Sequence, residues 1–164
     1  MATTTTPIIC GPATLPGLTQ HEAIADALHR CLAGIDSNDN ALFESACLKD
    51  EFKISFAESR TIPGWTATDD FFKQVSAITT THIASNVRVM ITHGGEWASL
   101  AANAVAYHIQ PGKAFTERDT PYTAGCLYLM HLKWDKRDGL WKIVTWNIWV
   151  LWTTGDLPVL HEQS

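Results

Sequence analysis

The sequence lacks the features that mark membrane-spanning, secreted and nucleic-acid-binding proteins. Its longest apolar runs, such as residues 148–152, are far shorter than the roughly 20 residues that cross a bilayer as a helix. The first ten residues contain no basic region followed by a long apolar stretch, so they do not resemble a secretory signal. Only 18% of the residues are charged, the net charge is −5, and no stripe of Lys or Arg could neutralise a phosphate backbone. We therefore expect neither a membrane nor nucleic acid as a partner.

Cysteine pairs and metal-binding motifs are also missing. The four Cys residues show no C-x-x-C spacing, and no Asn-x-Ser/Thr acceptor occurs, so a reduced, cytoplasmic setting is the simpler expectation. The seven His residues include no H-x-x-x-H or H-E-x-x-H pair. Phosphate-binding and dinucleotide-binding glycine loops and the G-x-S-x-G elbow are absent as well. We expect no metal and no cofactor.

What the chain does contain is apolar and aromatic mass. Of its 164 residues, 46% are hydrophobic and seven are Trp. This length fits one domain, so the indoles must fill or line one large interior. We expect a flexible arm over residues 1–18, the folded domain over residues 19–156 and a tail over residues 157–164.

Helical signals come first along the chain and strand signals follow. Thr19 and Glu22 form a capping box before apolar residues spaced by three and four, from Ile24 to Ile35. The sequence predicts further helices over residues 40–45 and 68–75, and strands over residues 51–56, 81–93, 96–110, 122–135 and 140–152. Long strands twist strongly. The predicted class is α+β, with a curved antiparallel sheet closed by three N-terminal helices into a cone around a pocket.

His82 and Asp36 are the candidate catalytic pair. His82 lies near the start of a predicted strand, which would aim its imidazole at one face of the sheet. Asp36 lies at the end of the first predicted helix, from which a carboxylate could reach that sheet. An Asp that orients a His makes a general base. The alternatives are a structural His and a solvated Asp at a helix end.

Strand alternation determines which side chains share a face with the candidate base. If His82 points inward, so does Asn86. In the third long strand, alternation places His131 with Leu129 on one face and Tyr128 on the other. The sequence does not decide which of these two faces lines the pocket.

The last predicted strand adds a polar residue among bulky ones. Asn147 and Trp149 share a face, and the Asn147 amide could there hydrogen-bond a substrate carbonyl. Core packing or a subunit interface is the alternative for both, and equally for Tyr128 and His108. The candidate substrate-binding residues are Phe56, Trp65, Asn86, Tyr128, Leu129, Asn147 and Trp149.

Several short pieces of the sequence occur in the order typical of one superfamily. They are Asp36-Ser37-Asn38-Asp39, Thr81-His82-Ile83-Ala84-Ser85-Asn86-Val87, Ala106-Tyr107-His108, Gly125-Cys126-Leu127-Tyr128, Asp138-Gly139-Leu140-Trp141-Lys142-Ile143 and Trp152-Thr153-Thr154-Gly155-Asp156. From about residue 19 to residue 156 the chain resembles the SnoaL-like branch of the NTF2-like (cystatin-like) superfamily. Within it, the chain is similar to scytalone dehydratases, to LinA-type dehydrochlorinases and to fungal biosynthetic isomerases and cyclases. The resemblance implies cofactor-free chemistry in a cone pocket, with Asp36 and His82 at the positions of the family's Asp-His dyad.

The departures from that family pattern concern the pocket. Ile35 and Phe56 stand where scytalone dehydratases present a pair of Tyr residues. Leu129 and His131 stand where those enzymes have a pocket Ser and Asn. A more apolar substrate and a second imidazole are implied.

The residues and the resemblance together predict a cofactor-independent lyase, isomerase or cyclase of polyketide, terpenoid or alkaloid biosynthesis. His82, oriented by Asp36, is the expected base, and His131 is the expected partner acid. The alternatives are an epoxide-opening hydrolase or cyclase on the same scaffold, and a non-catalytic ligand-binding or interaction module. The expected ligand is a hydrophobic small molecule. Exposed aromatic surface and the resemblance predict a homo-oligomer, either a dimer or a trimer.

Overall fold

The computed structural model describes residues 13–57, 60–92, 94–110 and 121–156. The predicted tail over residues 157–164 and most of the predicted arm over residues 1–18 lie outside these ranges. The elements are α1 (Gln20–Ser37), α2 (Asn40–Ser45), β1 (Lys53–Phe56), β2 (Arg60–Pro63), α3 (Gly64–Val75), β3 (Thr79–Ile91), β4 (Trp97–Ile109), β5 (Tyr122–Asp135) and β6 (Leu140–Thr154). No described helix is long and apolar enough to cross a membrane.

Helix α1 forms as its sequence predicts. The Thr19 side chain accepts a hydrogen bond from the Glu22 backbone N–H, and the Glu22 carboxylate accepts one from the Thr19 N–H at 2.7 Å. The apolar stripe from Ile24 to Ile35 is buried. The helix ends at Asn38, whose left-handed backbone (φ 54°) lets its N–H bond the last carbonyls. The buried apolar face of α1 packs against the sheet.

The α+β class is confirmed, but the sheet is mixed and not antiparallel throughout. Its strand order is β2-β1-β6-β5-β4-β3, and β1 runs parallel to β6 with Ile54 opposite Trp146. The β2 strand was not predicted, because four residues ending in a proline show no clear alternation. The two edge strands, β2 and β3, do not pair with each other, so the sheet is open.

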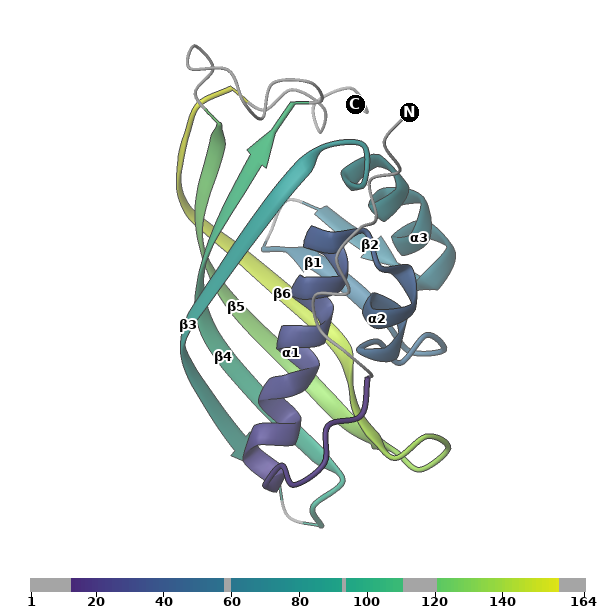
Figure 1. Cartoon of the computed structure of the whole chain (residues 1–164). Coiled ribbons are helices and arrows are strands. Elements are labelled where there is room, and N and C mark those ends of the chain that lie inside the picture. The colour runs from purple at the N-terminus through teal and green to yellow at the C-terminus, as the bar shows by residue number, and fades with distance from the viewer. Residues whose placement is uncertain (1–12, 58–59, 93, 111–120, 157–164) are drawn as a thin grey trace.

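The long strands β3 to β6 curve around α1, while α3 lies over the short strands β1 and β2 (Figure 1). Close approach of α1 to α2 depends on Gly34, since a Cβ there would lie 2.5 Å from the Phe43 backbone nitrogen. Phe43 in turn stacks on Trp65 and contacts Phe72. The helices are thus joined by aromatic packing on one side of the sheet.

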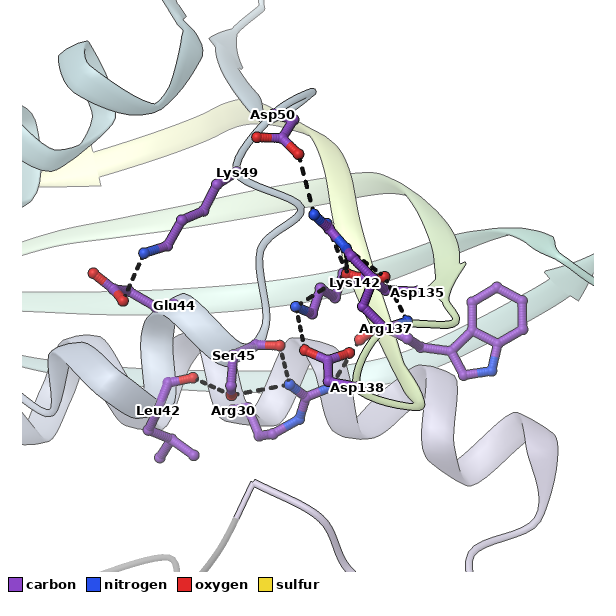
Figure 2. A network of polar contacts seen from close by, with 11 residues as sticks. Arg30, Leu42, Glu44, Ser45, Lys49, Asp50, Asp135, Arg137, Asp138 and Lys142 are labelled. Carbon is purple, nitrogen blue, oxygen red and sulfur yellow. Dashed lines mark hydrogen bonds and ion pairs between the residues drawn. The ribbon is translucent and has the colours of Figure 1, made fainter.

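Arg30 ties α1 to two other segments in the buried interior. Its side chain is only 5% exposed and pairs with Asp26 at 2.7 Å. The guanidinium also donates to the carbonyl and hydroxyl of Ser45, the last residue of α2, and to the Trp141 carbonyl in β6 at 2.8 Å. Figure 2 shows this arginine between the helices and the strand. The Arg30 N–H groups thus pair with partly or fully buried oxygens on α1, α2 and β6.

A second set of charges holds the β5–β6 turn. The Asp135 carboxylate accepts hydrogen bonds from Arg137 and pairs with Lys142, which also contacts Asp138 (Figure 2). The Arg137 hydrogen bonds, helped by Lys142, hold the pKa of Asp135 well below its usual range despite some burial. The Asp135 carboxyl in this turn is therefore ionised at neutral pH.

Replacing Arg30 with Met should lower the free energy of unfolding by about 2–4 kcal/mol, because the partly buried Asp26 carboxylate, the Ser45 carbonyl and the buried Trp141 carbonyl lose their donor. Urea unfolding followed by circular dichroism measures the change. Lys136→Met is the matched control, since that lysine is 73% exposed and its pairing with Glu96 should contribute less than about 1 kcal/mol. Equal stability losses in the two variants would refute the anchoring role of Arg30.

Candidate active site

A pocket of about 320 Å³ opens on the face of the sheet that carries the helices. Its walls come from α1, β1, β2, α3 and the four long strands. Most of the lining is apolar or aromatic, including Ile35, Phe56, Phe71 and Trp146. Because β1 to β6 and α3 each contribute side chains, the pocket exists only in the folded domain.

Asp36 lies in the last turn of α1 and reaches across to β3 with both carboxylate oxygens. Oδ1 accepts from the Thr80 hydroxyl at 2.8 Å and lies 2.6 Å from Nδ1 of His82. Oδ2 accepts from the His82 backbone N–H at 2.7 Å. Three donors on β3 therefore converge on one side chain of α1.

The position of Asp36 runs against the helix dipole. The C-terminal end of a helix carries partial negative charge, and the last turn of α1 contains no basic residue to offset it. Burial raises the pKa of Asp36, but the hydrogen bonds and charge of His82 and the Thr80 hydroxyl outweigh it. The pKa of Asp36 therefore falls below its ordinary value of 3.8. The carboxylate form is held in place by β3.

The contact with Asp36 determines which nitrogen of His82 carries the proton. An ionised carboxylate can only accept, so Nδ1 must donate and Nε2 of the neutral ring is left as an acceptor. The His82 side chain is 8% exposed and lines the apolar pocket. The geometry thus presents one basic nitrogen on an oriented ring, which is the arrangement required for general base chemistry.

The pair also borders a second, more polar cavity of about 440 Å³ between α1 and β3. His29, Asp36, Thr80 and His82 contribute to its walls. The Asp36 side chain is 23% exposed. His82 therefore lies between the apolar pocket and this second cavity. Asp36 lines the second cavity.

His108 on β4 is a second imidazole of the pocket. Its ring meets that of His82 edge to face, with centroids 5.8 Å apart. Burial and the neighbouring His82 lower the pKa of His108 from 6.5 to about 4, although Asp36 and the Tyr122 backbone oppose the shift. His108 is therefore neutral at pH 7, and its buried Nδ1 has no hydrogen-bond partner among the described residues.

The β5 side chains at the inner end of the pocket are weak acids kept in their protonated forms. Burial raises the pKa of Tyr128 and also that of the Cys126 thiol. Tyr128 packs edge to face on Trp146 at 5.1 Å and is 2% exposed. A protonated phenol in an apolar pocket is a hydrogen-bond donor for a substrate oxygen.

Of the sequence candidates, the structure brings Asp36, His82, Phe56 and Tyr128 to this region, but it places His131 elsewhere. His131 is exposed on the opposite face of the sheet, where its Nδ1 lies 3.2 Å from the Ser99 hydroxyl. Its expected place in the pocket is therefore wrong.

Leu129, Asn147 and Trp149 share that opposite face and do not line the pocket. The Asn147 amide donates to the Leu129 carbonyl at 3.4 Å. Leu129 alternates with the inward-facing Tyr128 on β5, which places it on the outer face. For Asn147 and Trp149 the physical reason is a bulge in β6: His131 pairs with Thr145 and Leu132 with Ile143, so Val144 is an extra residue. The bulge changes the face that residues after Val144 occupy relative to those before it.

Asn86 and Trp65 also lie outside the pocket. Asn86 has φ 53° at a register shift between β3 and β4, and its exposed amide donates to Asn103. Because the bulge breaks alternation, Asn86 does not follow His82 inward. Trp65 packs against Phe43 and Phe52 in the helical layer.

The sequence interpretation did not identify Arg60, Phe71 or Tyr122 as pocket residues, and it left packing as an alternative for His108. Arg60 lies on the unpredicted strand β2. Tyr122 and His108 face each other across β4 and β5 at 5.7 Å, a pairing that alternation alone does not reveal. Within the described ranges no cluster of three His, Cys, Asp or Glu side chains is arranged to hold a metal.

The chain belongs to the SnoaL-like domain family, whose model matches residues 16–147. It is 31% identical over 148 residues to the terrestric acid biosynthesis cluster protein E of Penicillium crustosum, covering 90% of this chain and 93% of that protein.

Solved structures share the fold at lower identity. A candidate scytalone dehydratase from Novosphingobium aromaticivorans superposes with a TM-score of 0.69 at 16% identity, over 87% of this chain and 93% of that one. A type 2 hexachlorocyclohexane dehydrochlorinase, LinA, gives a TM-score of 0.65 at 18% identity, over 84% of this chain and 88% of the other. These likenesses establish an NTF2-like fold.

In an NMR titration, the His108 imidazole should titrate with a midpoint at pH about 4 because burial and His82 disfavour its charged form. The unfolded chain, with a His pKa of 6.5, binds more protons between these values, so His108 should make stability rise with pH across this window. His108→Asn identifies the signal and should flatten that part of the stability profile. A midpoint near 6.5 would rule out the neutral pocket imidazole.

Proposed function

We propose that the protein is a cofactor-independent lyase, isomerase or cyclase that moves a proton on a small apolar molecule of natural-product biosynthesis. One observation carries this proposal: the Asp36 carboxylate holds Nδ1 of His82 at 2.6 Å on the wall of an apolar pocket. Family membership supports an enzyme of this type. The resemblance to a biosynthesis cluster protein supports the pathway class.

In the proposed mechanism, Nε2 of His82 removes a proton from a carbon of the substrate. Asp36 stabilises the imidazolium that forms and keeps its ring in place. The electron pair left on the substrate moves toward an oxygen or a leaving group, and Tyr128 is placed to donate a hydrogen bond to the developing negative oxygen. Return of the proton at another atom completes an isomerisation, whereas loss of the leaving group completes an elimination.

The apolar pocket supplies the other part of the proposed catalysis. Ile35 and Phe56 add no polar group to the pocket wall, so their part of the wall offers no site to hold a water near the dyad. Shape then orients the reacting carbon toward His82, and orientation contributes strongly to rate when the geometry is near the reactive one. We propose that the substrate is an intermediate of polyketide, terpenoid or alkaloid biosynthesis.

Two alternatives use the same pocket. Epoxide opening would employ His82 to activate a water or an internal hydroxyl, with the same dependence on Asp36. A binding module would hold the ligand without turnover. The apolar lining could bind a ligand without any reaction. A direct test of proton transfer therefore separates the binding module from the proposed enzyme and from the epoxide-opening enzyme.

The neutral probe 5-nitro-1,2-benzisoxazole reports base strength in the pocket, because removal of its ring C–H proton opens the ring to a coloured phenolate. We expect catalysed opening by the natural protein, a loss of about 100-fold or more in His82→Ala, and at least about tenfold in Asp36→Asn. Added imidazole should partly restore His82→Ala. Absorbance gives the rates, and circular dichroism confirms that the variants fold.

His131→Asn is the matched control for this assay. It removes an imidazole from the opposite face of the sheet and should leave the rate within about twofold. A folded His82→Ala protein with full activity would eliminate the proposed base. Absence of any catalysed opening in the natural protein would favour the binding module.

We further propose that a second copy of the chain covers the outer face of the sheet. Ile83, Val105, Leu127, Trp149 and Trp152 form an outer band across the four long strands, and the cross-strand register places them in two adjacent rows. The Trp152 indole lies over Gly125, where a Cβ would collide with it. Trp152 is 51% exposed and Ile83 54%, and neither row contains a charged residue. An uncharged apolar band is self-compatible even in a chain of net charge −5.

Light scattering at micromolar concentration should give the mass of a dimer or a trimer of the 18.1 kDa chain. Trp149→Glu should shift the mass toward 18.1 kDa by placing a charge in the buried interface. Leu15→Glu is the control, since Leu15 is 44% exposed but precedes α1. A monomeric natural protein, or equal dissociation by both substitutions, would refute the outer band as the interface.

A further inference from the structure

Arg60 is the single permanently charged side chain among the described residues that line the apolar pocket. It begins β2 and lies opposite Phe56 in the β1–β2 pair. The other titratable groups of the lining are His82, His108, Cys126 and two tyrosines. A guanidinium in this setting is unlike any other group of the pocket, because it cannot lose its charge.

The guanidinium is positioned by the aromatic wall of the pocket. Its central carbon lies 5.8 Å from the centroid of the Phe71 ring, within the range of a cation–π contact. Phe71 packs edge to face on Phe56 at 5.9 Å, and both rings line the pocket. Arg60 therefore stands against the same surface that an apolar substrate would contact.

No carboxylate of the described part of the chain pairs with Arg60. Most other Lys and Arg side chains of the same ranges do form ion pairs, as Arg30, Lys133 and Lys142 do. Within those ranges, no Asp or Glu lines the pocket. The described residues of the lining thus provide no negative charge to compensate the positive charge at this wall.

The pocket has an exposed end and a buried end. Arg60 is exposed and Val150 is 48% exposed, whereas Tyr128 is 2% exposed and the His82 side chain 8%. Arg60 belongs to β2 and His82 to β3, the two opposite edges of the sheet. A single ligand in the pocket can therefore meet the arginine at one end and the imidazole at the other.

We propose that the substrate is an organic acid: an apolar body that carries one anionic oxygen group, a carboxylate or an equally acidic enolate, bound by Arg60 at the pocket rim. The fork of N–H donors matches two oxygens at once, and charge-assisted pairs of this kind are strong and directional. Binding the anion at the rim directs the opposite end of the molecule toward His82. That the opposite end of the substrate reacts at His82 rests on the proposed function, whereas anion binding by Arg60 does not require turnover.

A matched pair of probes tests the anion site directly. The anion 1-naphthaleneacetate and the neutral 1-naphthaleneacetamide have nearly the same size and shape, and calorimetry gives the dissociation constant of each. We expect the natural protein to bind the acetate about tenfold more tightly, a typical gain for one partly exposed charge-assisted contact. The preference should shrink as salt is raised from low to physiological concentration.

Arg60→Gln should abolish the preference for the acetate, and Arg60→Lys should restore part of it because the charge returns without the planar fork. Arg88→Gln is the control, since Arg88 is exposed on β3 and does not line the pocket; it should keep the preference. Equal affinity for both probes in the natural protein, failure of both to bind, or an unchanged preference in Arg60→Gln overturns the proposal.

Different results would overturn the proposed catalysis by His82 and the proposed organic-acid substrate. Probe binding involves no proton transfer, so a missing acetate preference in a protein whose benzisoxazole opening depends on His82 overturns only the organic-acid substrate. A clear acetate preference in a protein whose benzisoxazole opening does not depend on His82 overturns only the proposed catalysis and leaves an anion-binding pocket.

Discussion

The carboxylate of Asp36 is the point on which the arrangement of helix, sheet and pocket depends. It joins the last turn of α1 to β3 through the Thr80 hydroxyl, the His82 backbone and the His82 ring. A negative charge at a helix C-terminus is unfavourable on its own, so this position is tolerable only while β3 supplies the donors. The contacts that stabilise the carboxylate are also those that orient the imidazole. Structural and chemical requirements therefore meet in one side chain.

Irregularities in the strands decide which side chains meet that imidazole. Asn86 interrupts β3 after His82, and the extra residues Val144 and Leu151 interrupt β6. Each bulge moves the following residues to the other face and adds local twist. The pocket wall is consequently assembled from short segments of regular alternation, such as the part of β6 that carries Trp146.

These bulges explain how far the sequence could be interpreted. Helix α1 was predictable because its capping box and apolar stripe are local signals, and Asp36 and His82 were predictable because they lie at the ends of such elements. His131 was misplaced because a period of two fixes only relative faces and does not show that the Tyr128 face of β5 is the inner one. Asn147 was misplaced because the unseen bulge at Val144 reverses the faces along β6. The parallel pairing of β1 with β6 and the existence of β2 depend on contacts between distant segments, which no local pattern encodes.

The proposed roles of the two pocket imidazoles follow from their different surroundings. Both rings lie within 5.8 Å of each other, so protonating both would place two positive charges side by side in an apolar pocket. His108 has no carboxylate in hydrogen-bond contact among the described residues, and burial holds its pKa at about 4. His82 contacts Asp36 directly, so the charge gained on accepting a proton is compensated there. A proton taken from a substrate should therefore remain on His82, while neutral His108 and Tyr128 provide polar contacts without competing for it.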